Sequence, residues 1–139
     1  MPDDQWAGIV KTNTEVLPTY AQAKQEADEY MTALAAQRKR ESGPTRSFQA
    51  INLRPGLLTD QPATRKVELG ITPKGRGSVT REDVAIVADM LLGRADTEGW
   101  IDLVNGEEGV EAAVERIARE KVDAVVGEDV EGMVQRFFP

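Results

Sequence analysis

A helical repeat of hydrophobic positions dominates the first third of the chain. Its apolar and aromatic residues lie three or four positions apart, at Tyr20, Ala23, Ala27, Met31 and Leu34. This spacing predicts one long helix, with Thr19 as its N-cap. The helix should end near Arg40, because Gly43 and Pro44 follow and both residue types stop helices. Residues 1–17 show weak periodicity and are predicted to form an irregular N-terminal arm.

Continuous apolar runs predict buried strands farther along the chain. The run at 48–54 ends in Pro55-Gly56, which predicts a sharp turn, and a second core strand is expected at 100–106. A short strand is expected at 67–71, and the segments 57–66 and 72–78 are expected to be loops.

Three more helical segments are expected. Thr80 and Asp83 resemble a capping box that opens a helix closed by Gly93. A long helix is expected at about 108–126, and residues 129–138 should add a terminal turn or short helix. Helices that alternate with apolar strands favour an α/β fold with a parallel sheet flanked by helices, spanning residues 18–139.

Composition excludes several kinds of chemistry. The 139 residues include no cysteine and no histidine, so disulfides, cysteine or histidine zinc sites and serine–histidine–acid triads are impossible within the chain. A general acid or base must therefore be a carboxylate, a lysine or a tyrosine.

The charge balance argues against two classes of partner. The net charge of −7 makes a broad nucleic-acid surface unfavourable, and the basic run 38–40 lies where the first helix should end, where cations complement the helix dipole. No apolar run is long enough to span a bilayer, and residues 1–10 do not form a secretory signal. A cytoplasmic protein is expected, with no nucleic-acid or membrane partner.

Several segments in order carry a resemblance to a known family. They are YAQAKQEADEY at 20–30, INLRPGLLTDQPATRKVELG at 51–70, GRGSVTREDVAIVADMLL at 75–92 and WIDLVNGEEGVEAAV at 100–114. Together they resemble the C-terminal half of a short-chain dehydrogenase/reductase, in the atypical branch of NAD(P)-binding Rossmann proteins. The resemblance runs from about Pro18 to Val114, and its Tyr-x-x-x-Lys element alone is a weak signal.

The resemblance implies catalytic and cofactor-binding residues. It implies that Tyr20 is the general acid that gives a proton to a carbonyl oxygen as the carbon receives hydride. It implies that Lys24, one helical turn away, stabilises the phenolate and binds the cofactor ribose. Pro55, Gly56 and Leu57 would lie against the nicotinamide of NADP or NAD. No metal is implied.

Plainer interpretations stay open for the same residues. Tyr20 and Lys24 also fit a helix-start aromatic residue and a lysine that extends its amine into solvent. Pro55-Gly56 also fits a tight turn with no ligand role.

The family's dinucleotide-binding half has no counterpart in the sequence. No strand followed by a G-x-G-x-x-G fingerprint opens the chain. We therefore expect a partial Rossmann-like sheet that lacks the N-terminal dinucleotide-binding half. The edge of its strand at 48–54 would be open and prone to association, either as a homo-oligomer or with the missing half.

Three functions are compatible with this sequence. The first is a truncated short-chain-reductase-type protein that, if completed, reduces or oxidises a small carbonyl or alcohol with NAD(P)H and is inactive as this chain alone. The second is a non-catalytic nucleotide-sensing or interaction protein of the same lineage. The third sets the resemblance aside and is a small acidic α/β interaction domain. The sequence does not identify the substrate or choose NAD from NADP, because the deciding residue lies in the absent half.

Overall fold

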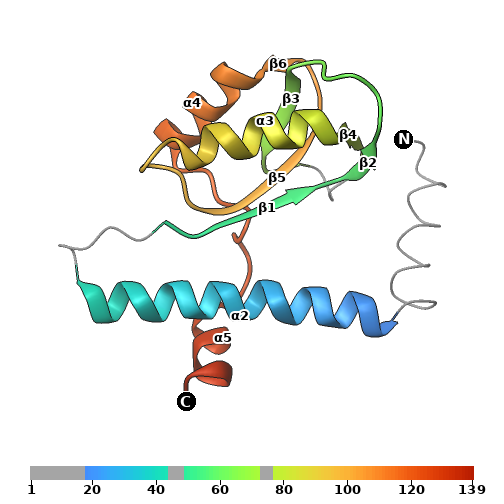
Figure 1. Ribbon diagram of the computed structural model, residues 1–139. Helices are drawn as coiled ribbons and strands as arrows, with labels where there is room; N and C mark the ends of the chain where they lie inside the picture. The colour runs from blue at the N-terminus through green and yellow to red at the C-terminus, as the bar shows by residue number, and fades with distance from the viewer. Residues whose placement is uncertain (1–17, 44–48, 73–76) are drawn as a thin grey trace. The chain divides into compact units, whose positions relative to one another are not determined.

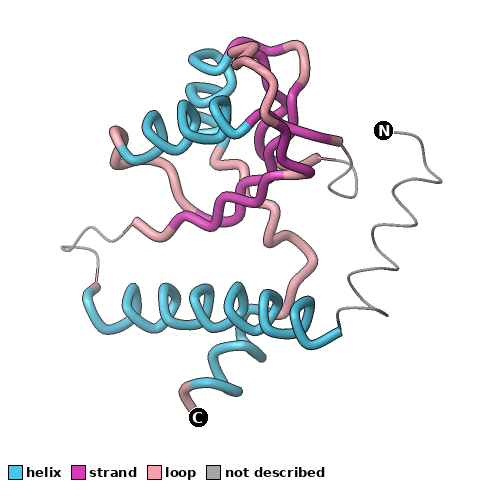
Figure 2. The backbone as a smooth tube through the Cα atoms, turned by 45° about the vertical axis from the view of Figure 1, so that its right-hand side comes forward, coloured by secondary structure: helices cyan, strands magenta, loops and turns pink. Residues whose placement is uncertain are grey.

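A computed structural model describes residues 18–43, 49–72 and 77–139 (Figure 1). The arm predicted at 1–17 lies outside these residues. The chain divides into two compact units. The first comprises Met1–Ala50 with Gly127–Pro139, and the second comprises Ile51–Val126. Among the described residues the strands belong to the second unit, as Figure 2 shows in magenta.

Two helices form the described part of the first unit, α2 (Pro18–Ser42) and α5 (Val130–Phe137). The predicted long helix is confirmed as α2, but Thr19 lies within it, so the N-cap prediction is wrong. The helix ends where expected, because Gly43 adopts a φ of +66° and its N–H donates to the carbonyl of Lys39 at 3.2 Å. The predicted terminal helix is confirmed as α5, which Asp129 caps by accepting from the Gly132 N–H at 3.0 Å.

The core of the first unit is small and joins the two helices. Ala33 is fully buried and packs with Met133 and Val134 of α5. Tyr30 meets the ring of Phe137 edge to face, with 5.2 Å between ring centroids. The predicted apolar stripe on α2 is therefore wrong in its first half, where the side chains of residues 20, 23 and 27 are exposed. The buried face is set by α5, about a hundred residues away in the sequence.

A four-stranded sheet is the centre of the second unit, with strand order β1-β5-β3-β6. The strands are β1 (Ile51–Pro55), β5 (Gly99–Asn105), β3 (Lys66–Gly70) and β6 (Glu108–Gly109). β1 and β5 pair in parallel, whereas β3 runs antiparallel to both β5 and β6. The predicted α/β class and partial Rossmann-like sheet are confirmed, and the antiparallel β3 makes the sheet mixed.

Two helices of the second unit, α3 (Arg81–Leu92) and α4 (Val110–Glu120), share one hydrophobic core with the sheet (Figure 1). The core residues alternate along the strands and repeat with helical spacing on the helices, at Val67, Leu69, Ile101, Leu103, Val87, Leu91, Val110, Val114 and Ile117. α4 is shorter than the predicted 108–126, because Lys121 turns left-handed at φ 51° and ends it.

A second, two-stranded sheet was not expected from the sequence. β2 (Leu57–Thr59) pairs in parallel with β4 (Ser78–Thr80). β2 lies inside the loop predicted at 57–66, and β4 begins at the last residue of the loop predicted at 72–78. The Pro55-Gly56 step is likewise no sharp turn. It passes β1 directly into β2, so Gly56 marks the place where the chain leaves one sheet for the other.

Candidate functional site

Tyr20 and Lys24 lie one turn apart near the start of α2. The side chain of Tyr20 is 57% exposed and Lys24 is exposed as well. Their helix places both on the surface of the first unit, where a tyrosine hydroxyl and an amine one turn apart can meet the same ligand.

Pro55, Gly56 and Leu57 lie in the second unit, at the step between β1 and β2. The predicted site residues therefore belong to two separate units. Pro55 is exposed, and Gly56 and Leu57 are half-buried. The backbone is fixed here, because the Gly56 N–H donates to the carbonyl of Leu103 at 2.9 Å and the Leu57 N–H to that of Gly77 at 3.1 Å.

The space beside Gly56 is occupied by the protein itself. A Cβ atom there would lie 2.5 Å from the Gly77 carbonyl oxygen and 2.9 Å from Cγ1 of Val104. The glycine is thus needed for the close approach of β1, β4 and β5. This packing by itself accounts for a glycine at position 56.

A buried carboxylate of the second unit was not predicted as a centre of contacts. Asp83 is fully buried at the start of α3. It accepts from the backbone N–H groups of Thr64 (3.0 Å) and Arg65 (2.9 Å), the Thr80 hydroxyl (2.9 Å) and the Asn105 amide (2.8 Å). The Asp83 N–H donates in turn to the Thr80 hydroxyl oxygen at 2.9 Å, which confirms the predicted cap.

The electrostatics of Asp83 define its role. Burial raises the pKa of a carboxyl group, but the hydrogen bonds from Thr64, Asn105, Arg65 and Thr80 outweigh burial and lower the pKa of Asp83 to about 2. Asp83 therefore stays ionised at neutral pH, with its lone pairs taken up by the protein. It ties together the loop before β3, the start of α3 and the end of β5, and it is unsuited to exchange protons with a substrate.

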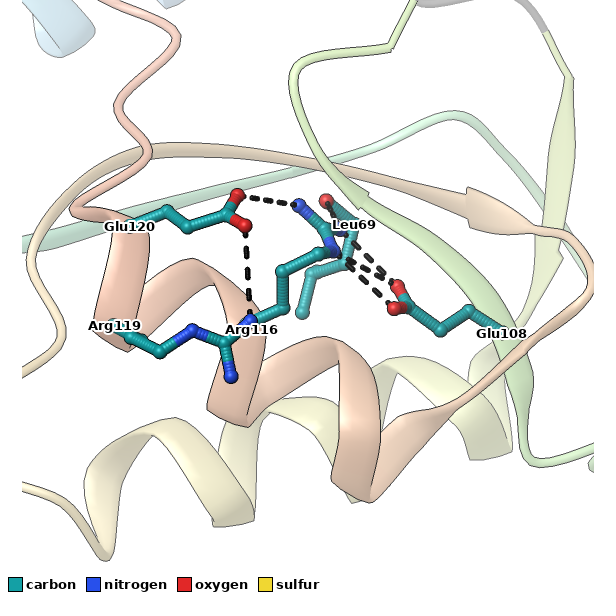
Figure 3. A network of polar contacts seen from close by, with 5 residues as sticks. All are labelled: Leu69, Glu108, Arg116, Arg119 and Glu120. Atoms are coloured by element: carbon teal, nitrogen blue, oxygen red, sulfur yellow. Dashed lines mark hydrogen bonds and ion pairs between the residues drawn. The ribbon is translucent and has the colours of Figure 1, made fainter.

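A second polar network holds α4 against β3 (Figure 3). Arg116 donates to the backbone carbonyl of Leu69 at 2.7 Å and forks onto the carboxylate of Glu108 at 3.1–3.2 Å. Glu120 lies 3.9 Å from the Arg116 guanidinium and 3.7 Å from that of Arg119. These contacts give each of the three guanidinium nitrogens of Arg116 a partner within the fold.

An open cavity of about 320 Å³ lies in the first unit. It is lined by three acidic residues, one basic residue and two uncharged residues, namely Glu29, Glu128, Asp129, Arg136, Gly132 and Met133. Most of these groups are already engaged, because Arg136 pairs with Glu29 and Asp129 caps α5. A hydrogen bond from Gln25 and the guanidinium of Arg136 lower the pKa of Glu29 despite its partial desolvation.

Two kinds of site are not found in the described parts of the chain. No three histidine, cysteine, aspartate or glutamate side chains gather there to hold a metal ion. Among the described helices, none combines the length and the apolar character needed to cross a membrane.

Comparison with known proteins gives a likeness of fold. No family model and no curated protein matches the sequence. The oxidoreductase ylbE from Lactococcus lactis matches 76% of this chain and 42% of its own, at 24% identity and a TM-score of 0.58. A Bacillus halodurans protein provisionally assigned as an NAD-dependent epimerase/dehydratase matches 52% of this chain and 35% of its own, at 31% identity and a TM-score of 0.44. The chain thus spans less than half the length of either.

Proposed function

We propose that this chain is part of an NAD(P)-binding domain of short-chain-reductase type. The observation that carries the proposal is the fold likeness to a solved oxidoreductase over 76% of the chain. The Tyr-x-x-x-Lys spacing on α2 supports it, because the helix of the structure keeps both residues on the surface, one turn apart. Completed by a dinucleotide-binding half, such a domain would reduce or oxidise a small carbonyl or alcohol in the cytoplasm.

The described residues fit this cofactor only in part. Tyr20 and Lys24 have the residue types and the spacing for the nicotinamide end. The space that a Cβ would take at Gly56 is not available to a ligand, because atoms of Gly77 and Val104 fill it. No glycine-rich turn between a strand and a helix is present in the described segments to cradle a pyrophosphate. We therefore propose that NADP or NAD binds only when a second half supplies that cradle.

The proposed chemistry of this chain is proton transfer. The bound nicotinamide would supply the hydride. The Tyr20 hydroxyl would donate its proton to the carbonyl oxygen as negative charge develops there. The Lys24 amine, a cation one turn along α2, would stabilise the phenolate that remains and hold the cofactor ribose.

Tyr20→Phe tests this role, with Tyr30→Phe as the matched control on the same helix. In a preparation completed by a dinucleotide-binding half, Tyr20→Phe should lower turnover of NADPH with a small carbonyl about a hundredfold or more and spare NADPH binding. Tyr30→Phe should change neither quantity, because it keeps the ring that packs on Phe137. Equal turnover in the two variants would exclude Tyr20 as the acid.

A non-catalytic nucleotide-sensing or interaction protein of the same lineage is the second candidate. The observation that favours it is the packing of Gly77 and Val104 against Gly56, which fills the space beside a glycine that the enzyme interpretation assigns to the cofactor. It predicts saturable dinucleotide binding by the completed domain, no turnover with any carbonyl, and no effect of Tyr20→Phe.

A further inference from the structure

The two edges of the four-stranded sheet differ. One edge is β6, which has only two residues, and such short edge strands give little opportunity for pairing with another chain. The other edge is β1, which pairs with β5 at all five of its positions, from Ile51 to Pro55, in an unbroken parallel ladder. Within the described residues, β1 pairs with no other strand. A regular strand with one open edge is a template for further pairing.

One hydrogen bond fixes which groups of β1 face outward. The Gly56 N–H donates to the Leu103 carbonyl of β5 at 2.9 Å. Because backbone groups alternate in direction along a strand, Ile51, Leu53 and Pro55 direct theirs away from β5. The open edge therefore offers two donors, the N–H groups of Ile51 and Leu53, and three carbonyl acceptors. Pro55 has no N–H, but its backbone groups face away from β5, so no hydrogen bond between β1 and β5 is lost.

We propose that β1 pairs with β1 of a second copy of this chain. The two strands would run antiparallel about a two-fold axis through Leu53. The Leu53 residues of the two copies would exchange two hydrogen bonds, and each Ile51 N–H would donate to the Pro55 carbonyl of the other copy. In this register all four outward N–H groups, two from each copy, find an acceptor. Pro55 has no N–H and lies opposite Ile51 of the other copy, so only the Ile51 carbonyl lacks a donor. It joins the two sheets into one.

The side chains of β1 are compatible with that register. Ile51 and Leu53 are half-buried at the border of the core formed with α3 and α4, so a neighbouring strand would cover them further. On the other face Asn52 would lie opposite Arg54 of the second copy, so a neutral amide meets each guanidinium and the two arginines avoid direct opposition. The amide nitrogen of Asn52 is buried and has no hydrogen-bond partner among the described residues.

Self-pairing goes beyond the proposed function and concerns this chain in the absence of a completing half. The net charge of −7 opposes association of two copies, so the test belongs at physiological salt, where screening weakens that repulsion. A completing half and a second copy would compete for the same edge. Failure of dinucleotide binding therefore says nothing about self-pairing, and a monomeric chain says nothing about dinucleotide binding.

Sedimentation equilibrium of the full chain tests the proposal, with a matched pair of variants. Leu53→Pro removes the two central donors, and it spares the ladder with β5 because that N–H faces outward. Leu53→Ala removes a comparable side chain and keeps the donor. The wild type and Leu53→Ala should form dimers at micromolar to submillimolar concentration. Leu53→Pro should weaken dimerisation about tenfold or more relative to Leu53→Ala, as two lost hydrogen bonds require.

Hydrogen exchange on the wild type decides the matter if Leu53→Pro does not fold. Exchange of the Ile51 and Leu53 amides should slow as protein concentration rises, whereas the amide of Gly56 should be slow throughout because β5 already holds it. A wild type that stays monomeric over the whole range would overturn the proposal. Equal dimerisation by Leu53→Pro and Leu53→Ala would also overturn it. Protection of the Ile51 and Leu53 amides that is independent of protein concentration would overturn it as well, because it would mean that β1 pairs with a strand of the same chain.

Discussion

Replacing Asp83 by asparagine should destabilise the second unit in a pH-dependent way. The substitution keeps the size of the side chain but replaces one acceptor oxygen with an NH2 group. The carboxylate accepts from the backbone N–H groups of Thr64 and Arg65, and from the side chains of Thr64, Thr80 and Asn105. An amide nitrogen would face at least one of these donors, so we expect a loss of about 3 kcal/mol at neutral pH.

The pH dependence follows from the shift in the Asp83 pKa. Folding lowers this pKa from an ordinary 3.8 to about 2. The difference corresponds to about 2 kcal/mol of stability. Because the folded-state pKa is the lower one, that contribution is fully present above the unfolded pKa and is lost as the pH falls through the folded pKa. Asparagine does not titrate, so the stability difference between wild type and variant should contract by about 2 kcal/mol from about pH 6 to about pH 2.

Urea unfolding followed by tryptophan fluorescence measures this difference. A Trp6→Phe background leaves Trp100, which is buried in β5, as the single reporter of the second unit. Asp89→Asn is the matched control, since Asp89 is an exposed aspartate on the same helix. Asp89→Asn should cost under about half a kcal/mol at any pH. A difference between wild type and Asp83→Asn that stays constant with pH, or equals that of Asp89→Asn, would refute the assigned role.

Two further substitutions test the packing and the second polar network. In the same assay Gly56→Ala should lower the free energy of unfolding by about 2 kcal/mol, because the new Cβ would lie 2.5 Å from a backbone carbonyl oxygen. Gly109→Ala should lower it little, because nothing lies within 4 Å of a Cβ at that position. Equal losses would contradict the close approach at Gly56. Arg116→Met should lower the free energy of unfolding by about 1 kcal/mol more than Arg119→Met, because Arg116, unlike Arg119, donates to the Leu69 carbonyl. A loss no larger than that of Arg119→Met would show that this network does not stabilise the fold.

The sequence predicted the larger elements because their patterns are local. The apolar runs behind β1 and β5 and the Thr80 cap of α3 each lie within a few consecutive residues. β2 and β4 were missed because three residues show no period, and each strand exists only through the other, about twenty positions away. α4 was predicted too long because the left-handed turn at Lys121 has no glycine to announce it.

The candidate site was predictable only in part. The spacing of Tyr20 and Lys24 can be read directly from the sequence, and its place on a helix was predicted correctly. The contacts of Asp83 were not visible, because Thr64 lies 19 residues before it and Asn105 lies 22 residues after it. The local signal was limited to a cap aspartate and an asparagine that ends a strand. Only the folded arrangement of β5 and α3 brings Asn105 within hydrogen-bond distance of Asp83.

Dinucleotide binding by a completed chain shows whether this fold is part of an NAD(P)-binding domain. The chain would be fused to the part of the Lactococcus lactis oxidoreductase that it does not match, and both the fusion and the chain alone would be titrated with NADPH and NADH, followed by ligand fluorescence. Circular dichroism would establish that each is folded. We expect saturable binding by the fusion, weakened about tenfold by Lys24→Met, and no binding by the chain alone. A folded fusion that binds neither dinucleotide, or a chain that binds one without its completing half, would contradict the proposal.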